Sequence, residues 1–239
     1  FGFGGLSRQN RIALNDSLNF IQNASSRSGS LDLSNTGSSG LIHNFNIGNK
    51  TSLKTIYSIN GTNYREEDNY YNKIKGPLIV TRNNQFQELN AILSIVATHK
   101  INKKNLIKVG FNTNGKNFFL NQREAVSNVL KDKVKEEGDT RLSQYFLQWK
   151  LDPSNKVRFL MGLHGQYFAL NRSHAIEPRM GIRIQTGKTQ FFSAGYGLHS
   201  QIQPLGNYFA RIRVGVDSIQ PNRNLDFSKA QHYVVGYNI

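Results

Sequence analysis

The fold is decided by the stretch Ser173-His-Ala-Ile-Glu-Pro-Arg-Met-Gly-Ile-Arg-Ile-Gln-Thr-Gly-Lys-Thr-Gln-Phe-Phe-Ser-Ala-Gly-Tyr-Gly-Leu-His-Ser-Gln201. Apolar and polar residues alternate along residues 177–185 and 190–199, which predicts two strands joined by the turn at 186–189. In the first strand Met180, Ile182 and Ile184 share one face, and Arg179 and Arg183 lie on the other. Strands with two such unlike faces are typical of a wall between lipid and a polar interior.

The same pattern continues outward from this stretch over most of the chain. About ten strands are expected by period-two alternation and turn residues, at 28–34, 41–48, 53–60, 88–100, 105–113, 141–151, 156–171, 177–185, 190–199 and 231–239. Short turns alternate with three polar segments that we interpret as long loops, near 61–86, 114–140 and 200–229. Unequal connections of this kind are expected where one end of a barrel carries turns and the other carries loops.

Three smaller expectations complete the outline of the chain. Asn35-Thr-Gly-Ser is predicted to be a turn, and residues 126–135 to contain one or two helical turns. Residues 1–25 lack a clear pattern and could be a first barrel strand or a segment in the lumen.

Composition excludes several classes of protein. The 239 residues contain no cysteine, so disulfides and cysteine metal sites are ruled out. No run of about 18 apolar residues occurs, which excludes a transmembrane helix. The formal charge of +15 would suggest nucleic acid as a partner of a soluble protein. The basic residues instead lie at turns and in the polar segments, without a nucleic-acid-binding motif, so we expect no nucleic-acid partner.

No motif for catalysis, metal or cofactor binding is present. The histidines lie on separate strands without a ligand spacing, and Glu66-Glu67-Asp68 lacks the pattern of a calcium loop. Thr186-Gly-Lys-Thr lacks the upstream glycine of a phosphate-binding loop and leads into a strand. We therefore expect no enzyme activity, no catalytic residue, no metal and no cofactor.

From His164 onward the chain resembles the barrel of TonB-dependent outer-membrane receptors of the Bacteroidetes type. The residues that carry the resemblance are His164-Gly-Gln-Tyr-Phe, Ser173-His-Ala-Ile-Glu-Pro-Arg-Met-Gly, Phe192-Ser-Ala-Gly-Tyr-Gly-Leu-His-Ser-Gln, Gln203-Pro-Leu, Asn224-Leu-Asp-Phe-Ser-Lys-Ala and His232-Tyr-Val-Val-Gly-Tyr. Full-length members of this family carry a carboxypeptidase-like regulatory domain and a plug before the barrel.

The resemblance implies an all-β fold, an antiparallel transmembrane β-barrel of roughly 22 strands in the bacterial outer membrane. About ten of those strands are expected in residues 26–239. No plug and no TonB box are recognisable, and the last strand stops mid-strand at Ile239, so we expect a segment from inside a barrel. The implied partners are outer-membrane lipid, the TonB system acting through a plug outside this chain, and a siderophore, metal complex, glycan or peptide as ligand. A surface lipoprotein partner is left open.

Candidate functional residues follow from their position. Tyr70, Tyr71, Tyr208 and Arg211 lie in the expected loops, where aromatic and arginine side chains could contact a ligand. Arg179, Arg183 and His199 are expected to face the lumen. The two arginines there could pair with carboxylates of the lumen or the plug.

Two other interpretations remain open on sequence alone. One is a small autonomous outer-membrane barrel of eight to ten strands, acting as a channel or an adhesin. The other is a soluble basic β-protein that binds nucleic acid or polysaccharide, because a half-buried antiparallel sheet gives the same alternation. Strand length disfavours the soluble protein, since several predicted strands have about 10–16 residues against an average of about 5–6.

Overall fold

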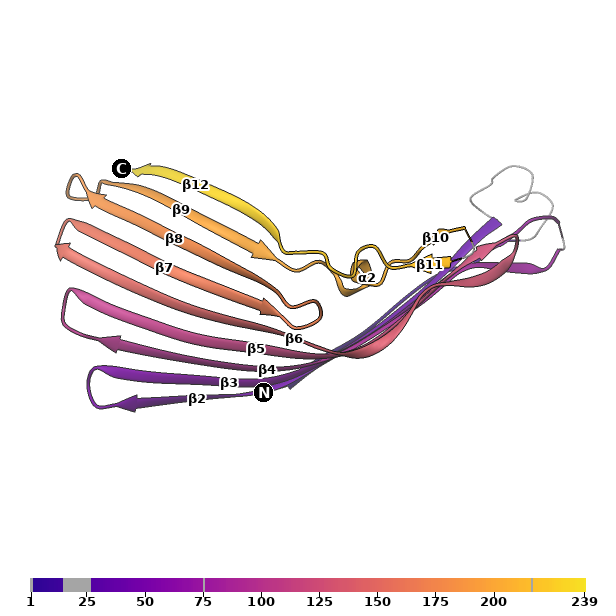
Figure 1. Ribbon diagram of the computed structural model, residues 1–239, viewed down its shortest axis with the longest axis horizontal. Coiled ribbons are helices and arrows are strands. Elements are labelled where there is room, and N and C mark those ends of the chain that lie inside the picture. Colours follow the sequence, from indigo (N-terminus) through magenta and orange to yellow (C-terminus); the bar gives the residue numbers. More distant parts are fainter. Residues whose placement is uncertain (1, 15–26, 75, 216) are drawn as a thin grey trace.

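The computed structural model describes residues 2–14, 27–74, 76–215 and 217–239, and these form one antiparallel sheet of ten strands (Figure 1). The strand order is β1-β2-β3-β4-β5-β6-β7-β8-β9-β12, and the sheet is open, with β1 and β12 at its edges. Its strands are β1 (Gly2–Arg11), β2 (Ser28–Ile47), β3 (Thr51–Tyr71), β4 (Leu78–Lys100), β5 (Asn105–Val126), β6 (Val129–Ser154), β7 (Val157–Phe168), β8 (Ser173–Gln185), β9 (Phe191–Gln201) and β12 (Ser228–Asn238). The all-β prediction is therefore confirmed.

One end of the sheet carries only short turns, which lie together at the left of Figure 1. These turns join β2 to β3, β4 to β5, β6 to β7 and β8 to β9, as the sequence predicts. Gly48 takes a positive φ of 63° in the first of them, a conformation that glycine adopts without a steric penalty. Backbone hydrogen bonds tie adjacent turns together, from the Asp152 N–H to the Lys104 carbonyl and from the Gln185 N–H to the Lys156 carbonyl.

At the opposite end, the expected loops near 61–86 and 114–140 are strands. β3 and β4 have 21 and 23 residues and leave only residues 72–77 between them, while β5 and β6 turn at Ser127 and Asn128. Polar residues occupy both faces of these hairpins and interrupt the regular alternation that reveals a half-buried strand. Cross-strand pairs stabilise them instead, such as the stacked rings of Tyr64 and Phe86, 6.1 Å apart.

Two local predictions are also wrong. β2 is continuous for 20 residues through Asn35-Thr-Gly-Ser, where Gly37 pairs with Gly4 on one side and Gly61 on the other. The glycines stand in a row across three strands rather than in a turn. The expected helical turns at 126–135 are a hairpin, because Ser127 and Asn128 both take positive φ, of 53° and 63°, as a two-residue hairpin turn requires.

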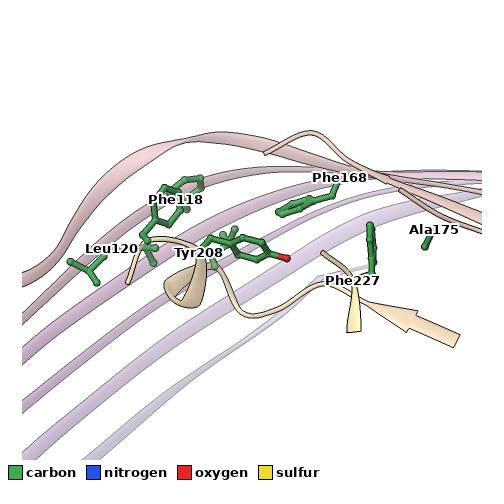
Figure 2. Close-up of a cluster of buried hydrophobic side chains, with 9 residues drawn as sticks. Phe118, Leu120, Phe168, Ala175, Tyr208 and Phe227 are labelled. Atoms are coloured by element: carbon green, nitrogen blue, oxygen red, sulfur yellow. The ribbon is translucent and has the colours of Figure 1, made fainter. Parts of the chain in front are cut away.

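The third expected loop, 200–229, is irregular as predicted and folds back onto the sheet. It contains α2 (Leu205–Tyr208) and a small hairpin of β10 (Ile212–Val214) and β11 (Asp217–Ile219). Figure 2 shows Tyr208 and Phe227 packed with Phe118, Leu120 and Phe168 of the sheet. This cluster holds the buried hydrophobic side chains of the described residues. No described helix has the length and hydrophobicity needed to cross a membrane.

Residues 1–25 lack a clear sequence pattern. Of these, Gly2–Arg11 form the edge strand β1, which pairs with β2 from Ser39 to Ser30. Residues 15–25 lie outside the described residues.

Candidate functional site: the two faces of the sheet

One face of the sheet is apolar across nine strands. Residues paired directly across an antiparallel sheet point to the same side, so the register identifies a continuous surface, here called the apolar face. Its large members are Leu41, Phe45, Ile47, Leu53, Tyr57, Ile59, Leu93, Ile95, Ile107, Val109, Phe111, Tyr145, Leu147, Trp149, Phe159, Met161, Leu163, Ile176, Met180, Ile182, Ile184, Phe192, Tyr196, Leu198, Tyr233, Val235 and Tyr237.

Many of these side chains are open to the surroundings rather than packed in a core. Leu41 is 73% exposed, Ile176 63%, Met180 59% and Val235 74%. Single exposed apolar residues are ordinary, but a contiguous apolar surface of this extent marks contact with lipid or with another macromolecule. The faces assigned from the sequence for β8 agree with the register, because Met180, Ile182 and Ile184 lie on the apolar face.

The apolar face ends partway along the longer strands. On β6 it runs through Trp149, Leu147 and Tyr145, and the next positions on the same side are Ser143, Arg141, Asp139 and Glu137. β3 shows the same change: on the side that carries Leu53, Tyr57 and Ile59, the next positions are Gly61, Asn63, Arg65 and Glu67. The apolar face is thus a band next to the short turns, and the hairpins extend beyond it as polar ribbons.

The opposite side, the polar face, centres on a buried carboxylate at Glu177. Its side chain is 1% exposed and makes four contacts. Oε2 lies 2.9 Å from His164 Nδ1 and accepts a hydrogen bond from the Arg179 guanidinium at 2.5 Å. Oε1 accepts hydrogen bonds from Gln166 Nε2 at 2.5 Å and from the Ser200 N–H at 3.0 Å.

With Gln144 of β6, this network connects four strands, β6 to β9, and it fixes the start of the folded-back segment. Gln166 Nε2 also donates to the Ser200 carbonyl at 2.8 Å, and Gln144 Nε2 donates to Gln166 Oε1 at 3.0 Å. Ser200 lies at the end of β9, where the chain leaves the sheet. Glu177 was not among the expected functional residues; the signal available in the sequence was that it is the single carboxylate of this strand.

The structure places Arg179, Arg183 and His199 on this same polar face, as their strand positions predict. Arg179 pairs with Glu177 of its own strand, so its carboxylate partner lies within this chain. Arg183 lies over the ring of Phe191, with 3.5 Å from its Cζ to the ring centroid. His199 contacts His232 edge to face, with ring centroids 4.8 Å apart.

The four candidate ligand contacts differ in their surroundings. Tyr70 donates a hydrogen bond to Asn128 Oδ1 at 3.3 Å, at the tips of the polar hairpins, and Tyr71 is the last residue of β3. Arg211 pairs with Glu136 at 2.6 Å. Tyr208 is fully buried, 5.3 Å from the Phe168 ring, and its hydroxyl accepts a hydrogen bond from the Gln203 N–H. Burial removes Tyr208 from the candidate contacts, because its packing leaves no side-chain surface for a ligand.

The polar hairpins also carry a charge network on the polar face. Arg82 pairs with Glu66 at 3.2 Å and with Asp68 at 3.3 Å. Burial raises the pKa of Asp68, and Arg82 opposes that rise. Burial, a hydrogen bond to Asp32 and nearby carboxylates raise the pKa of Tyr64 to about 12. Within the described residues, no group of three or more His, Asp and Glu side chains is placed to hold a metal ion.

Comparisons with protein families and with curated proteins identify no relative of this chain. A scan against models of protein families finds no match for this chain, and a search of curated proteins finds none either.

Proposed function

We propose that this chain is part of the wall of an outer-membrane β-barrel receptor of the TonB-dependent, Bacteroidetes type, which imports a bound ligand. The observation that carries the proposal is the exposed apolar face. In water such a surface would be strongly unfavourable, at about 25 cal/mol per Å². In a bilayer the same surface contacts acyl chains, and the ladder between adjacent strands supplies hydrogen bonds to the backbone.

The dimensions of the apolar face support a lipid boundary. On β8 it runs from Ile176 to Ile184, nine positions or about 27 Å along a strand axis. A barrel strand tilted by about 40° would cover roughly 21 Å of bilayer, close to the apolar band of about 25 Å in outer-membrane barrels. Trp149, Tyr145 and Tyr57 lie near the limits of this band, as expected for interfacial aromatic residues.

The polar face and the polar hairpins take complementary roles in this proposal. The polar face lines the lumen, where the Glu177 network secures the segment that folds back over it. The short turns lie on the periplasmic side, and the polar hairpins rise outside the cell. Tyr70, Tyr71 and Arg211 remain the candidate contacts for a small-molecule, glycan or peptide ligand. The plug, the TonB system and a surface lipoprotein partner are proposed from the resemblance alone.

The exposed apolar face disfavours the soluble basic β-protein, because nucleic acid or polysaccharide would not cover it. A small autonomous barrel would need its edges joined. Here β1 and β12 are not hydrogen-bonded to each other, which favours a wall continued by further strands.

A matched pair of leucines on β7 tests the lipid-facing assignment. Leu163 is on the apolar face and 51% exposed, whereas Leu160 is on the polar face and 42% exposed. Because the chain has no cysteine, Leu163→Cys and Leu160→Cys each introduce its single thiol for a bimane label. In bilayers that contain brominated acyl chains, we expect quenching at position 163 and little at position 160. Equal quenching at both positions, or at neither, would contradict the proposed function.

A further inference from the structure

A basic pocket lies at the short-turn end of the sheet, away from the Glu177 network. Its volume is about 580 Å³, and it is formed by the turns after β4, β6 and β8. Six basic side chains line it with one carboxylate, that of Asp152. They are Lys103, Lys104, Lys156, Arg158, Arg183 and Lys188.

The single carboxylate of the pocket already pairs with basic side chains of this chain. Asp152 accepts hydrogen bonds from Arg158 Nε at 2.7 Å and from its second guanidinium nitrogen at 3.3 Å, and it also pairs with Lys150 at 3.1 Å. Among the described residues, no carboxylate pairs with the four pocket lysines or with Arg183. The pocket therefore concentrates positive charge that the chain itself does not neutralise.

Local contacts hold several of these groups in place. Lys104 Nζ donates to the Pro153 carbonyl at 3.0 Å, Arg158 is fixed by Asp152, and Arg183 rests on the Phe191 ring. Backbone hydrogen bonds also join neighbouring turns. Side chains that are already held in place lose less conformational entropy on binding than free lysine side chains do.

From this arrangement we propose that the pocket binds an acidic peptide segment with several carboxylates. Lys104 and Lys188 belong to turns separated by three to four strand spacings, roughly 14–19 Å. A single small anion cannot contact both, whereas about five residues of extended peptide span that distance. The proposal concerns the polar face and does not depend on the membrane role.

Other anionic partners fit the pocket less well. A phospholipid needs apolar surface beside its headgroup, but among the residues that line the pocket only Val157 is an apolar residue on the side of the apolar face. Arg183 covers one face of its aromatic ring, Phe191, which leaves less surface for stacking of a nucleotide base.

The test measures binding of fluorescein-labelled hexaglutamate to the detergent-purified protein by fluorescence anisotropy. The pocket variant combines Lys156→Gln with Lys188→Gln, two exposed turn lysines without a described ion pair. The control combines Lys50→Gln with Lys100→Gln, which changes charge equally at the same end of the sheet but outside the pocket. We expect saturable binding that weakens with salt, a loss of about tenfold in the pocket variant, and less than about twofold in the control.

Three outcomes would overturn the proposal. These are absence of hexaglutamate binding, equal losses in the two variants, and tighter binding of pyrophosphate, oligonucleotide or anionic phospholipid vesicles than of hexaglutamate. Because the assay is performed in detergent, its failure would leave the bimane result on β7 unaffected, and the two proposals fail independently.

Discussion

At the scale of single residues, the polar face depends on one carboxylate that satisfies donors from three strands. Glu177 lies 1% exposed among His164, Gln166, Arg179 and the Ser200 N–H. Its pattern of contacts contrasts with surface ion pairs such as Arg65–Glu67, where the arginine side chain is 52% exposed. Removal of a buried partner leaves other polar groups without a hydrogen bond, which costs far more than loss of a surface pair.

We therefore expect Glu177→Ala to lower the free energy of unfolding by about 3–5 kcal/mol, because Arg179 and Gln166 lose their acceptor. Glu67→Ala is the matched control, since each glutamate pairs with an arginine two residues away on its own strand. Its expected cost is below about 1 kcal/mol. Urea unfolding of the detergent-solubilised protein measures both, and equal costs would show that the network does not stabilise the fold.

The stability of the polar hairpins should depend on pH in the alkaline range because of Tyr64. Its hydroxyl donates to Asp32 Oδ1 at 3.1 Å, and its pKa rises from 10.0 to about 12. The unfolded chain ionises this tyrosine first, so its stabilising effect is complete below pH 10 and is lost as the pH rises from 10 to 12. Tyr64→Phe should remove this part of the pH dependence of unfolding. An unchanged pH profile in the variant would contradict the assigned role.

At the scale of strands, the sequence predicts those with one apolar and one polar face and misses those with polar residues on both faces. β7, β8 and β9 alternate clearly because one side meets an apolar environment. The hairpin parts of β3 to β6 lack this contrast. The expected total of about ten strands agrees with the sheet because two errors cancel: the alternation predicts two strands within β2, and it leaves β1 without a predicted structure.

The sequence likewise does not reveal which residues pack closely between neighbouring strands. Gly110 of β5 faces Phe146 of β6 in direct register, and a Cβ atom at position 110 would overlap the Phe146 ring. Gly165 of β7, in contrast, has its nearest atom 4.0 Å from such a Cβ. A larger residue at position 110 would therefore displace the Phe146 ring, whereas position 165 has room for a Cβ atom.

Gly110→Ala should destabilise the sheet by about 1–3 kcal/mol through overpacking, whereas Gly165→Ala should be tolerated. Replacement of the ring by Phe146→Leu should recover most of the loss in the double variant. Thermal unfolding of the single and double variants measures this coupling. Additive effects of the two substitutions would show that the ring and the glycine do not interact.

At the scale of the whole molecule, the open sheet has a small core and a large exposed apolar face. The buried hydrophobic cluster lies where the segment after β9 meets the polar face (Figure 2), whereas many side chains of the apolar face are exposed. The apolar face could be anticipated from alternation, but its continuity across nine strands could not, because that depends on register. The folded-back segment and the basic pocket also require the assembled sheet.

The most direct test of the lipid-facing assignment is a spin-label scan along β6, which crosses the boundary of the apolar face. Single cysteines replace Trp149, Leu147 and Tyr145 in the band, Asp139 and Glu137 beyond it, and Gln148 and Gln144 on the polar face. Collision rates with oxygen and with a water-soluble nickel complex are measured in bilayers. We expect high oxygen accessibility only at 145, 147 and 149, and contact with the nickel complex at 137 and 139. Uniform contact with the nickel complex along this side of β6 would contradict a lipid-facing wall.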